Sequence, residues 1–183
     1  PFPSLKAEGS GVDRSKLPEL ATAVPSAFPD LQKATLKNGL NVVLATRKGI
    51  PTIVGSLVFN AGFASDALGK PGLASLAMDM LDEGTKTMNT LEISEKLQLL
   101  GASINAGSDI DASYLNFNTL KQTFDPTMDL FADILLNPAF PQKEFDRLKK
   151  EHLDDIEQEK SQPFGMILRV FPKAMYGQGH AYG

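Results

Sequence analysis

The chain has 183 residues, of which 42% are hydrophobic and 22% charged, with a formal net charge of -4 and no cysteine. These values predict one globular domain with a single core, and they exclude a disulfide framework, a thiolate nucleophile and a sulfur-ligated zinc site. No apolar run approaches the length of a membrane-spanning helix, and no cluster of lysine and arginine indicates nucleic-acid binding.

The first 30 residues show neither helical nor strand periodicity. They contain five prolines, Pro1, Pro3, Pro18, Pro25 and Pro29. Proline fixes φ and lacks a backbone donor, so residues 1–30 are predicted to form a linker or arm, and residues 31–183 the domain. The chain begins without an initiator methionine or an apolar leader, which leads us to expect a piece of a longer protein.

Residues 31–101 alternate between strand and helix signals. Segments 34–37 and 40–46 flank Asn38-Gly39 and predict a β-hairpin, because this dipeptide tolerates positive φ at both central positions. Segment 53–61 predicts a third strand. A helix is expected over 72–84 and another over 90–100. In the second, Asn89 and Glu92 match a capping box, and Gly101 supplies the C-terminal stop.

The remaining chain predicts a second hairpin followed by three helices. The strands are expected at 103–107 and 112–120, and the helices at 125–137, 142–160 and 164–175. In the helix at 142–160, four apolar residues at helical spacing predict one buried stripe: Phe145, Leu148, Leu153 and Ile156. Hairpin-linked strands with inserted helices predict an α+β fold, a mostly antiparallel sheet covered by helices on one side.

The helix at 72–84 has two distinct sides. The residues expected in the core are Leu73, Leu76, Ala77, Met80 and Leu81, and those expected on a polar outer edge are Ser75, Met78, Asp79 and Asp82. Ser75 and Asp79 are one turn apart, which is how a helix presents two metal ligands with an acid between them. The residue types at these positions do not suit that chemistry.

Several segments together resemble the pitrilysin-like (M16) zinc metallopeptidases. They are Leu36-Lys37-Asn38-Gly39-Leu40, Asn60-Ala61-Gly62, Gly72-Leu73-Ala74, Met80-Leu81-x-x-Gly84-Thr85, Gly101-Ala102, Asn137-Pro138-x-Phe140 and the closing Tyr176-Gly177-x-Gly179-His180-x-Tyr182-Gly183. The likeness covers most of the chain after residue 31. It implies the fold of the LuxS/MPP-like metallohydrolases.

The resemblance implies where the family's inverted motif, His-x-x-Glu-His, falls in this chain. The two zinc histidines fall on Ser75 and Asp79, the catalytic glutamate on Met78, and the downstream glutamate ligand on Asp155 or, next to it, Asp154. Zinc held by two imidazoles and a carboxylate activates water, and the glutamate accepts its proton. Methionine cannot accept a proton, so the chain is expected to be inactive by itself and to hold no cofactor.

The resemblance also implies a role. Many bacterial members join an intact half to a degenerate half, and others separate the halves into two subunits. The chain is expected to be the non-catalytic half of a zinc metalloendopeptidase that pairs with an active half, where the zinc would lie, to form a peptide-binding chamber. A scaffold subunit resembling the core proteins of the respiratory complex is the alternative. The bacterial periplasm is the expected compartment, with the cytoplasm as the second choice.

The family's mode of substrate binding implies one candidate site. In active halves, the substrate adds a strand to an exposed sheet edge, a mode that uses backbone hydrogen bonds. The corresponding edge here is the strand at 103–107, with Ser103, Asn105, Ala106 and Gly107 as the expected contacts and peptides as the ligands. Ala106-Gly107 is expected to permit close approach of a second backbone.

Two further interpretations concern metals and histidines. Ser75, Asp79 and Asp155 offer only oxygen donors, too few for a hard cation, so a solvated helix face is the preferred interpretation; an enzyme with an oxygen-only metal site is a third alternative. His152 is expected to be a half-buried packing residue and His180 to order a glycine-rich loop, with a substrate-groove role as the alternative for His180. A metal role for His152 requires His180 nearby.

Overall fold

The computed structural model of the chain describes residues 15, 29–47, 49–68, 70–177 and 179–183. The predicted arm at 1–30 lies almost entirely outside these residues. The chain divides into two compact units, residues 1–48 and 49–183, and each is described by itself.

The first unit contains the predicted hairpin around Asn38-Gly39. Strands β1 (Leu31–Thr35) and β2 (Asn41–Ala45) pair antiparallel. Gly39 adopts a φ of 87°, and the Asn38 side-chain oxygen accepts a hydrogen bond from the Leu40 backbone N–H at 3.1 Å. The hairpin was therefore predicted correctly, but only Gly39 of the two turn residues has a positive φ, and the first strand lies earlier in the chain than expected.

The second unit is built on a three-stranded antiparallel sheet in the order β3-β5-β4. Its strands are β3 (Thr52–Phe59), β4 (Ser103–Ser108) and β5 (Ser113–Leu120). Leu57 and Ala106 both lie opposite Leu115, so these three residues share one face of the sheet. Within the described residues, β4 pairs only with β5, which leaves its other side as a free edge.

Five α-helices and two 3₁₀ turns accompany the described strands. They are η1 (Phe63–Leu68), α1 (Leu73–Asp79), α2 (Thr90–Leu100), η2 (Lys121–Thr123), α3 (Phe124–Leu136), α4 (Gln142–Glu159) and α5 (Pro163–Tyr176). The capping box at the start of α2 is present, with Glu92 N–H donating to the Asn89 side chain at 3.0 Å and Asn89 N–H donating to Glu92 at 2.8 Å. Helix α3 begins one residue before the predicted Asp125, which does not cap it.

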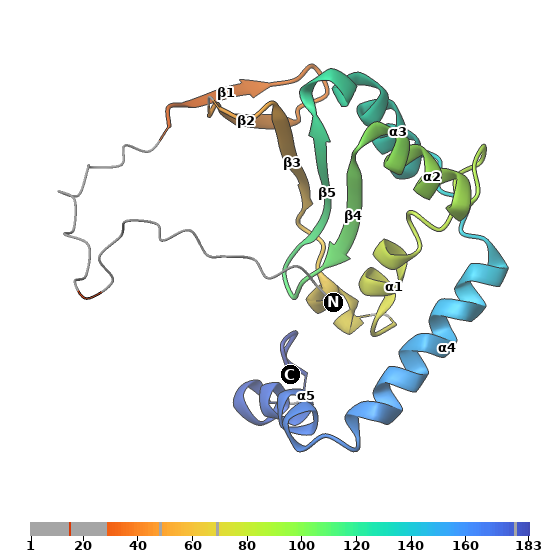
Figure 1. Ribbon diagram of the computed structural model, residues 1–183. Coiled ribbons are helices and arrows are strands. Elements are labelled where there is room, and N and C mark those ends of the chain that lie inside the picture. The colour runs from red at the N-terminus through yellow and green to blue at the C-terminus, as the bar shows by residue number, and fades with distance from the viewer. Residues whose placement is uncertain (1–14, 16–28, 48, 69, 178) are drawn as a thin grey trace. The chain divides into compact units, whose positions relative to one another are not determined.

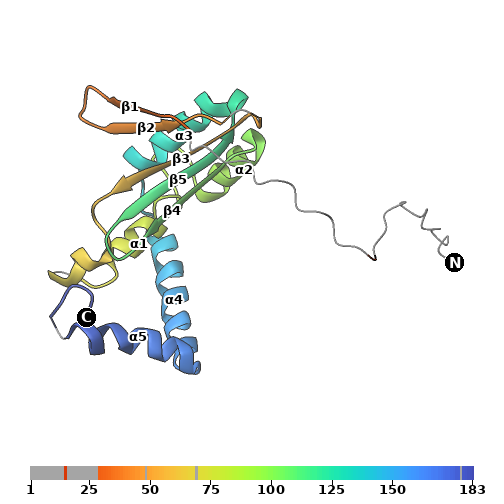
Figure 2. The ribbon, with the colours of Figure 1, turned by 90° about the vertical axis from the view of Figure 1, so that its left-hand side faces the viewer.

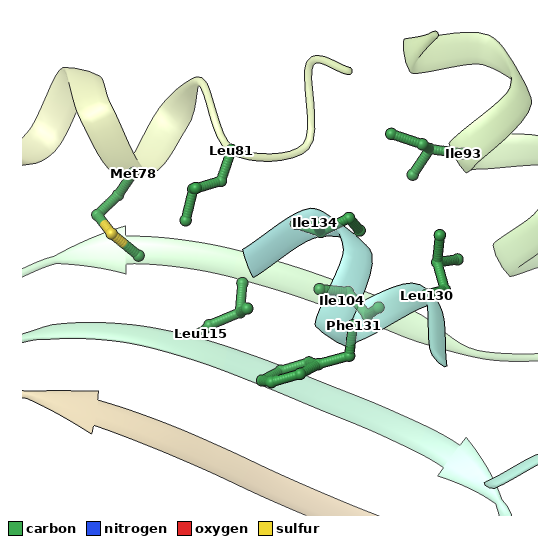
Figure 3. Packing of buried hydrophobic residues seen from close by; sticks show 8 residues of the cluster. All are labelled: Met78, Leu81, Ile93, Ile104, Leu115, Leu130, Phe131 and Ile134. Atoms are coloured by element: carbon green, nitrogen blue, oxygen red, sulfur yellow. The ribbon is translucent and has the colours of Figure 1, made fainter. Parts of the chain in front are cut away.

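One face of the sheet carries the hydrophobic core (Figure 3). The core joins residues of α1, α2, α3, β4 and β5 with Leu81, which follows α1: Met78, Leu81, Ile93, Ile104, Leu115, Leu130, Phe131 and Ile134. Phe131 meets Phe117 of β5 edge to face, with ring centroids 5.5 Å apart. Helices α1, α2 and α3 lie on this side of the sheet, as Figure 1 shows, and the predicted α+β fold with helices on one side is confirmed.

Helices α4 and α5 contribute little to this core. Leu148 is the buried residue of α4, and α5 has none. Leu153 and Ile156 are 56% and 37% exposed, so the predicted buried stripe of α4 continues only as far as its first half. Figures 1 and 2 show α4 leading away from the core to α5 at its far end. None of the helices in the described part of the chain has the length and apolarity that crossing a bilayer requires.

Candidate functional site

The position of α1 is set by a side chain that lies before it. Asp66 of η1 is only 9% exposed, and its two carboxylate oxygens accept the Ala74 backbone N–H at 3.0 and 3.3 Å. Because the first backbone N–H groups of a helix have no partner within the helix, this carboxylate stabilises its start. Helix α1 ends at Asp79, earlier than the predicted 84, and the chain then turns toward the loop at 84–90.

A guanidinium of α4 reaches the segment that follows α1. Arg147 forms an ion pair with Glu83, and it also contacts Glu144 at 2.8 Å and Glu151 at 3.0 Å on its own helix. Hydrogen bonds to Glu144, Glu83 and Glu151 raise the pKa of Arg147, and the same guanidinium lowers the pKa of Glu144. Arg147 therefore keeps its charge and holds the first half of α4 beside Glu83.

A second polar contact joins α4 to α1. The imidazole Nε2 of His152 lies 3.1 Å from Oδ2 of Asp79, and the two side chains are 44% and 37% exposed. His152 is thus half-buried, as expected, but it is held by a carboxylate as well as by packing.

A groove of about 360 Å³ runs beside this contact. It is lined by residues of α1, α4 and the edge strand β4 together with Asp82: Met78, Asp79, Asp82, Asn105, Ala106, Leu148, Glu151, His152 and Asp155. Four of these residues are carboxylates, and burial, together with repulsion from Glu83 and Asp79, raises the pKa of Asp82. The groove is therefore polar and carries an excess of negative charge.

A larger cavity of about 880 Å³ also includes His152 in its lining. Its wall includes residues of η1 and α5, the closing residues 180–183, and Ser75. In those closing residues, His180 stacks on Tyr176 with ring centroids 5.1 Å apart, and its Nδ1 accepts the Tyr182 N–H at 3.1 Å. The prediction that His180 orders its loop is confirmed. His152 and His180 both line this cavity.

Three of the four positions of the degenerate motif, Met78, Asp79 and Asp155, line the same groove, and Ser75 does not. Met78 is 8% exposed and belongs to the core, so its predicted place on an exposed edge was wrong. Asp79 and Asp155 line the groove, whereas Ser75 lines the larger cavity. Asp154, the other candidate for the third position, pairs with Lys150 at 2.9 Å instead. The apolar face of α1 is shifted, since Leu73, expected in the core, is 57% exposed.

The donor set at these positions does not fit a zinc ion. Zinc sites use imidazole, thiolate and carboxylate ligands, whereas the three ligand positions hold one hydroxyl and two carboxylates without an imidazole: Ser75, Asp79 and Asp155. The Nε2 atom of His152 lies 3.1 Å from the Asp79 carboxylate. Across the described residues, no group of three or more His, Cys, Asp or Glu side chains is arranged to hold a metal ion.

The residues expected to contact a peptide lie on β4. Ser103 and Asn105 are exposed, and Asn105 and Ala106 line the groove. A Cβ atom at Gly107 would lie 2.7 Å from the ring of Tyr114 on β5, so the tyrosine occupies the space above this glycine. Close packing of Tyr114 explains the glycine, and the binding role of Ser103, Asn105, Ala106 and Gly107 stays a prediction.

The Asp79–His152 contact was not predicted from the sequence. The two residues are 73 positions apart (152 − 79), and no periodicity relates them. Two features of the sequence could have suggested the contact. Asp79 stands at a zinc-ligand position of the family, and His152 lies on the helix where the resemblance places the downstream glutamate ligand. Only the packing of α4 beside α1 shows that the two meet.

Comparison with known proteins agrees with this geometry. The profile of the family described as Insulinase (Peptidase family M16) matches residues 41–181. The crystal structure titled as a peptidase M16 inactive domain from Pseudomonas fluorescens superposes with a TM-score of 0.79 at 27% identity, covering 84% of this chain and 37% of that one.

Two curated proteins illustrate the range of relatives. An uncharacterized zinc protease of Rickettsia bellii is 23% identical over 141 residues, which make up 77% of this chain and 34% of that protein. A Helicobacter pylori protein named non-peptidase homolog YmxG is 25% identical over 105 residues, 57% of this chain and 24% of that protein. The chain thus spans about a third or less of the length of these curated relatives.

Proposed function

Because this chain belongs to the M16 peptidase (insulinase) family, we propose that it is a non-catalytic M16 domain that pairs with an active half carrying an intact His-x-x-Glu-His motif. The active half is part of the same polypeptide or a partner subunit, and it holds the zinc. The proposal depends on which residues occupy the catalytic and ligand positions of the motif. A core methionine stands where the proton acceptor would be, and Asp79 contacts His152.

The exposed apolar surface of α5 supports pairing. Eight large apolar side chains of this 14-residue helix are between 48% and 72% exposed: Phe164, Met166, Ile167, Leu168, Val170, Phe171, Met175 and Tyr176. Large apolar side chains exposed in such number on one helix favour an interaction site. The relative from Rickettsia bellii is about three times as long as the matched region. We therefore propose that the rest of an M16 protein binds to this surface of α5.

The free edge of β4 supports a role in holding peptides. An extended peptide added to this edge would run along the groove, whose wall includes Asn105 and Ala106. Backbone hydrogen bonds to a strand edge tolerate many sequences, which suits a chamber that receives varied peptides. The proposal includes a periplasmic location, which cell fractionation of the native host tests.

The experiment is reconstitution with an M16 half from the same genome that has the intact motif. The chain alone is expected to leave a fluorogenic peptide uncut in the presence of zinc, and the mixture is expected to cut it in a chelator-sensitive way. Leu168→Asp and Phe171→Asp should weaken the pairing. Leu99→Asp, which changes a leucine on α2 that is 87% exposed, should not. Cleavage by the chain alone would overturn the proposal.

The same experiment separates this proposal from the alternative, a scaffold subunit without any peptidase partner. If the chain assembles stably with other proteins while no M16 half with an intact motif binds it, the scaffold role is correct. For the peptide-holding role, titration with an unfolded peptide is the direct measurement. The absence of saturable binding at millimolar concentration would reject it.

A further inference from the structure

We infer that the contact between Asp79 and His152 is a metal-independent clamp that fastens α4 to α1. The contact lies at the position where the family resemblance would place a metal ligand, and the residues present do not fit the metal. Two side chains of this chain then hold the two helices together without a metal ion. This inference does not depend on pairing with an active half.

Helix α4 needs such a clamp because little else holds its second half. The helix has 18 residues and is thus about 27 Å long. Leu148 in its first half is 9% exposed, whereas Leu153 and Ile156 in its second half are 56% and 37% exposed. Packing therefore secures the beginning of α4 far better than its end.

Two polar contacts join α4 to the segment that contains α1, as far as the structure describes the chain. Arg147 pairs with Glu83 near the buried Leu148, and His152 pairs with Asp79 further along the helix. The remaining ion pairs of α4 connect it to itself or to α5, such as Lys150 with Asp154. The Asp79–His152 contact is thus the polar link to α1 nearest the exposed half of α4.

Charged and polar groups line both of the pockets that include His152. The groove presents Asp79, Asp82, Glu151 and Asp155 to one side of the imidazole. The larger cavity is lined by Asp66 of η1, Glu159 of α4, Arg169 of α5, and His180 and Tyr182 of the closing segment. The His152 imidazole is the group of α4 that contacts one of these carboxylates, Asp79, on α1.

A double-mutant cycle tests the clamp. The variants are Asp79→Asn, His152→Gln and the two together, and the measurement is amide hydrogen exchange across α4 in the whole chain. Each single variant is expected to raise the opening equilibrium of the second half of α4 by roughly two- to fivefold, the range for partly exposed ion pairs. The double variant should exceed neither single variant.

A matched control and a distance measurement distinguish a clamp from a general loss of stability. Asp154→Asn breaks an ion pair of similar length whose two partners both lie on α4. Because the chain has no cysteine, labels can be placed at Leu73→Cys on α1 and Glu157→Cys on α4 without background. Asp79→Asn and His152→Gln are expected to broaden the distribution of label distances, and Asp154→Asn to leave it unchanged.

Two results would overturn the inference. One is additivity in the cycle, with unchanged label distances in both single variants, since the residues would then act independently. The other is stoichiometric zinc binding by the native chain that perturbs the His152 imidazole NMR signals and protects α4 from exchange. Zinc that leaves both signals unchanged supports the clamp.

Discussion

The side-chain oxygen of Thr127 on α3 lies 2.8 Å from that of Thr119 on β5, and both residues are almost fully buried. The Thr127 hydroxyl also donates to the Thr123 carbonyl at 2.7 Å. Two polar side chains thus join the helix layer to the sheet within the core. Buried hydroxyls are tolerated there because each one has a hydrogen-bond partner.

Thr127→Val is expected to destabilise the chain by about 1–3 kcal/mol. Valine has nearly the same shape, but it removes the hydroxyl and leaves Thr119 with poorer partners. Urea denaturation followed by circular dichroism measures the change. Thr52→Val, at an exposed position on β3, is the control and should change the free energy of unfolding by less than about 0.5 kcal/mol. Equal effects in the two variants would contradict the role of the buried pair.

Gly62, part of the Asn60-Ala61-Gly62 segment, is required by close backbone packing. A Cβ atom at this position would lie 2.3 Å from the Ile110 carbonyl oxygen and 2.5 Å from the Ala112 nitrogen. Gly62→Ala is therefore expected to lower stability by about 1–3 kcal/mol, because backbone atoms cannot rotate away. The thermal midpoint of unfolding measures it.

Gly165 in α5 is the matched glycine for this comparison. Its added Cβ atom would meet Glu159 at an ordinary contact distance of 3.5 Å. Gly165→Ala should raise stability by about 0.5–1 kcal/mol, because alanine loses less backbone entropy in a helix. A lower midpoint for this variant would mean that α5 does not form the helix described.

Asp82 in the groove predicts one pH dependence. Burial is the main cause that raises its pKa above 3.8, so the folded state favours the protonated carboxyl. The stability it contributes is complete below pH 3.8 and is lost as the pH rises through the folded pKa. Asp82→Asn is expected to be more stable than the native chain at pH 7, with the advantage disappearing below pH 3.8. An advantage that persists at acid pH would contradict this assignment.

Asp133 on α3 predicts the opposite dependence. Hydrogen bonds from Thr85, Asn137 and Thr87 lower its pKa below 3.8, so the carboxylate stabilises the folded state above that pH. The contribution is lost as the pH falls through the folded pKa. Asp133→Asn should be less stable than the native chain at pH 7 and approach it in acid. Asp129→Asn, an exposed change on the same helix, serves as the control in parallel denaturation curves.

The order and type of the elements were predictable from local signals. Asn38-Gly39 specified a hairpin turn, and the Asn89–Glu92 capping box with Gly101 specified both ends of α2, because these signals act within a few residues. The positions of the degenerate motif were predictable from the resemblance, because the segments that flank them keep the residues of the family. That Met78 cannot accept a proton follows from the sequence by itself.

The tertiary structure decided which of these residues meet. Helical periodicity fixes the directions of Met78 and Leu73 relative to each other, but it does not determine which of them faces the sheet. Met78 is buried and Leu73 is exposed because of how α1 packs. The stripe of α4 is periodic throughout, yet only Leu148 is buried, because burial depends on what lies opposite. The contact between Asp79 and His152 requires two helices to approach across 73 residues of chain (152 − 79), and no local rule determines that approach.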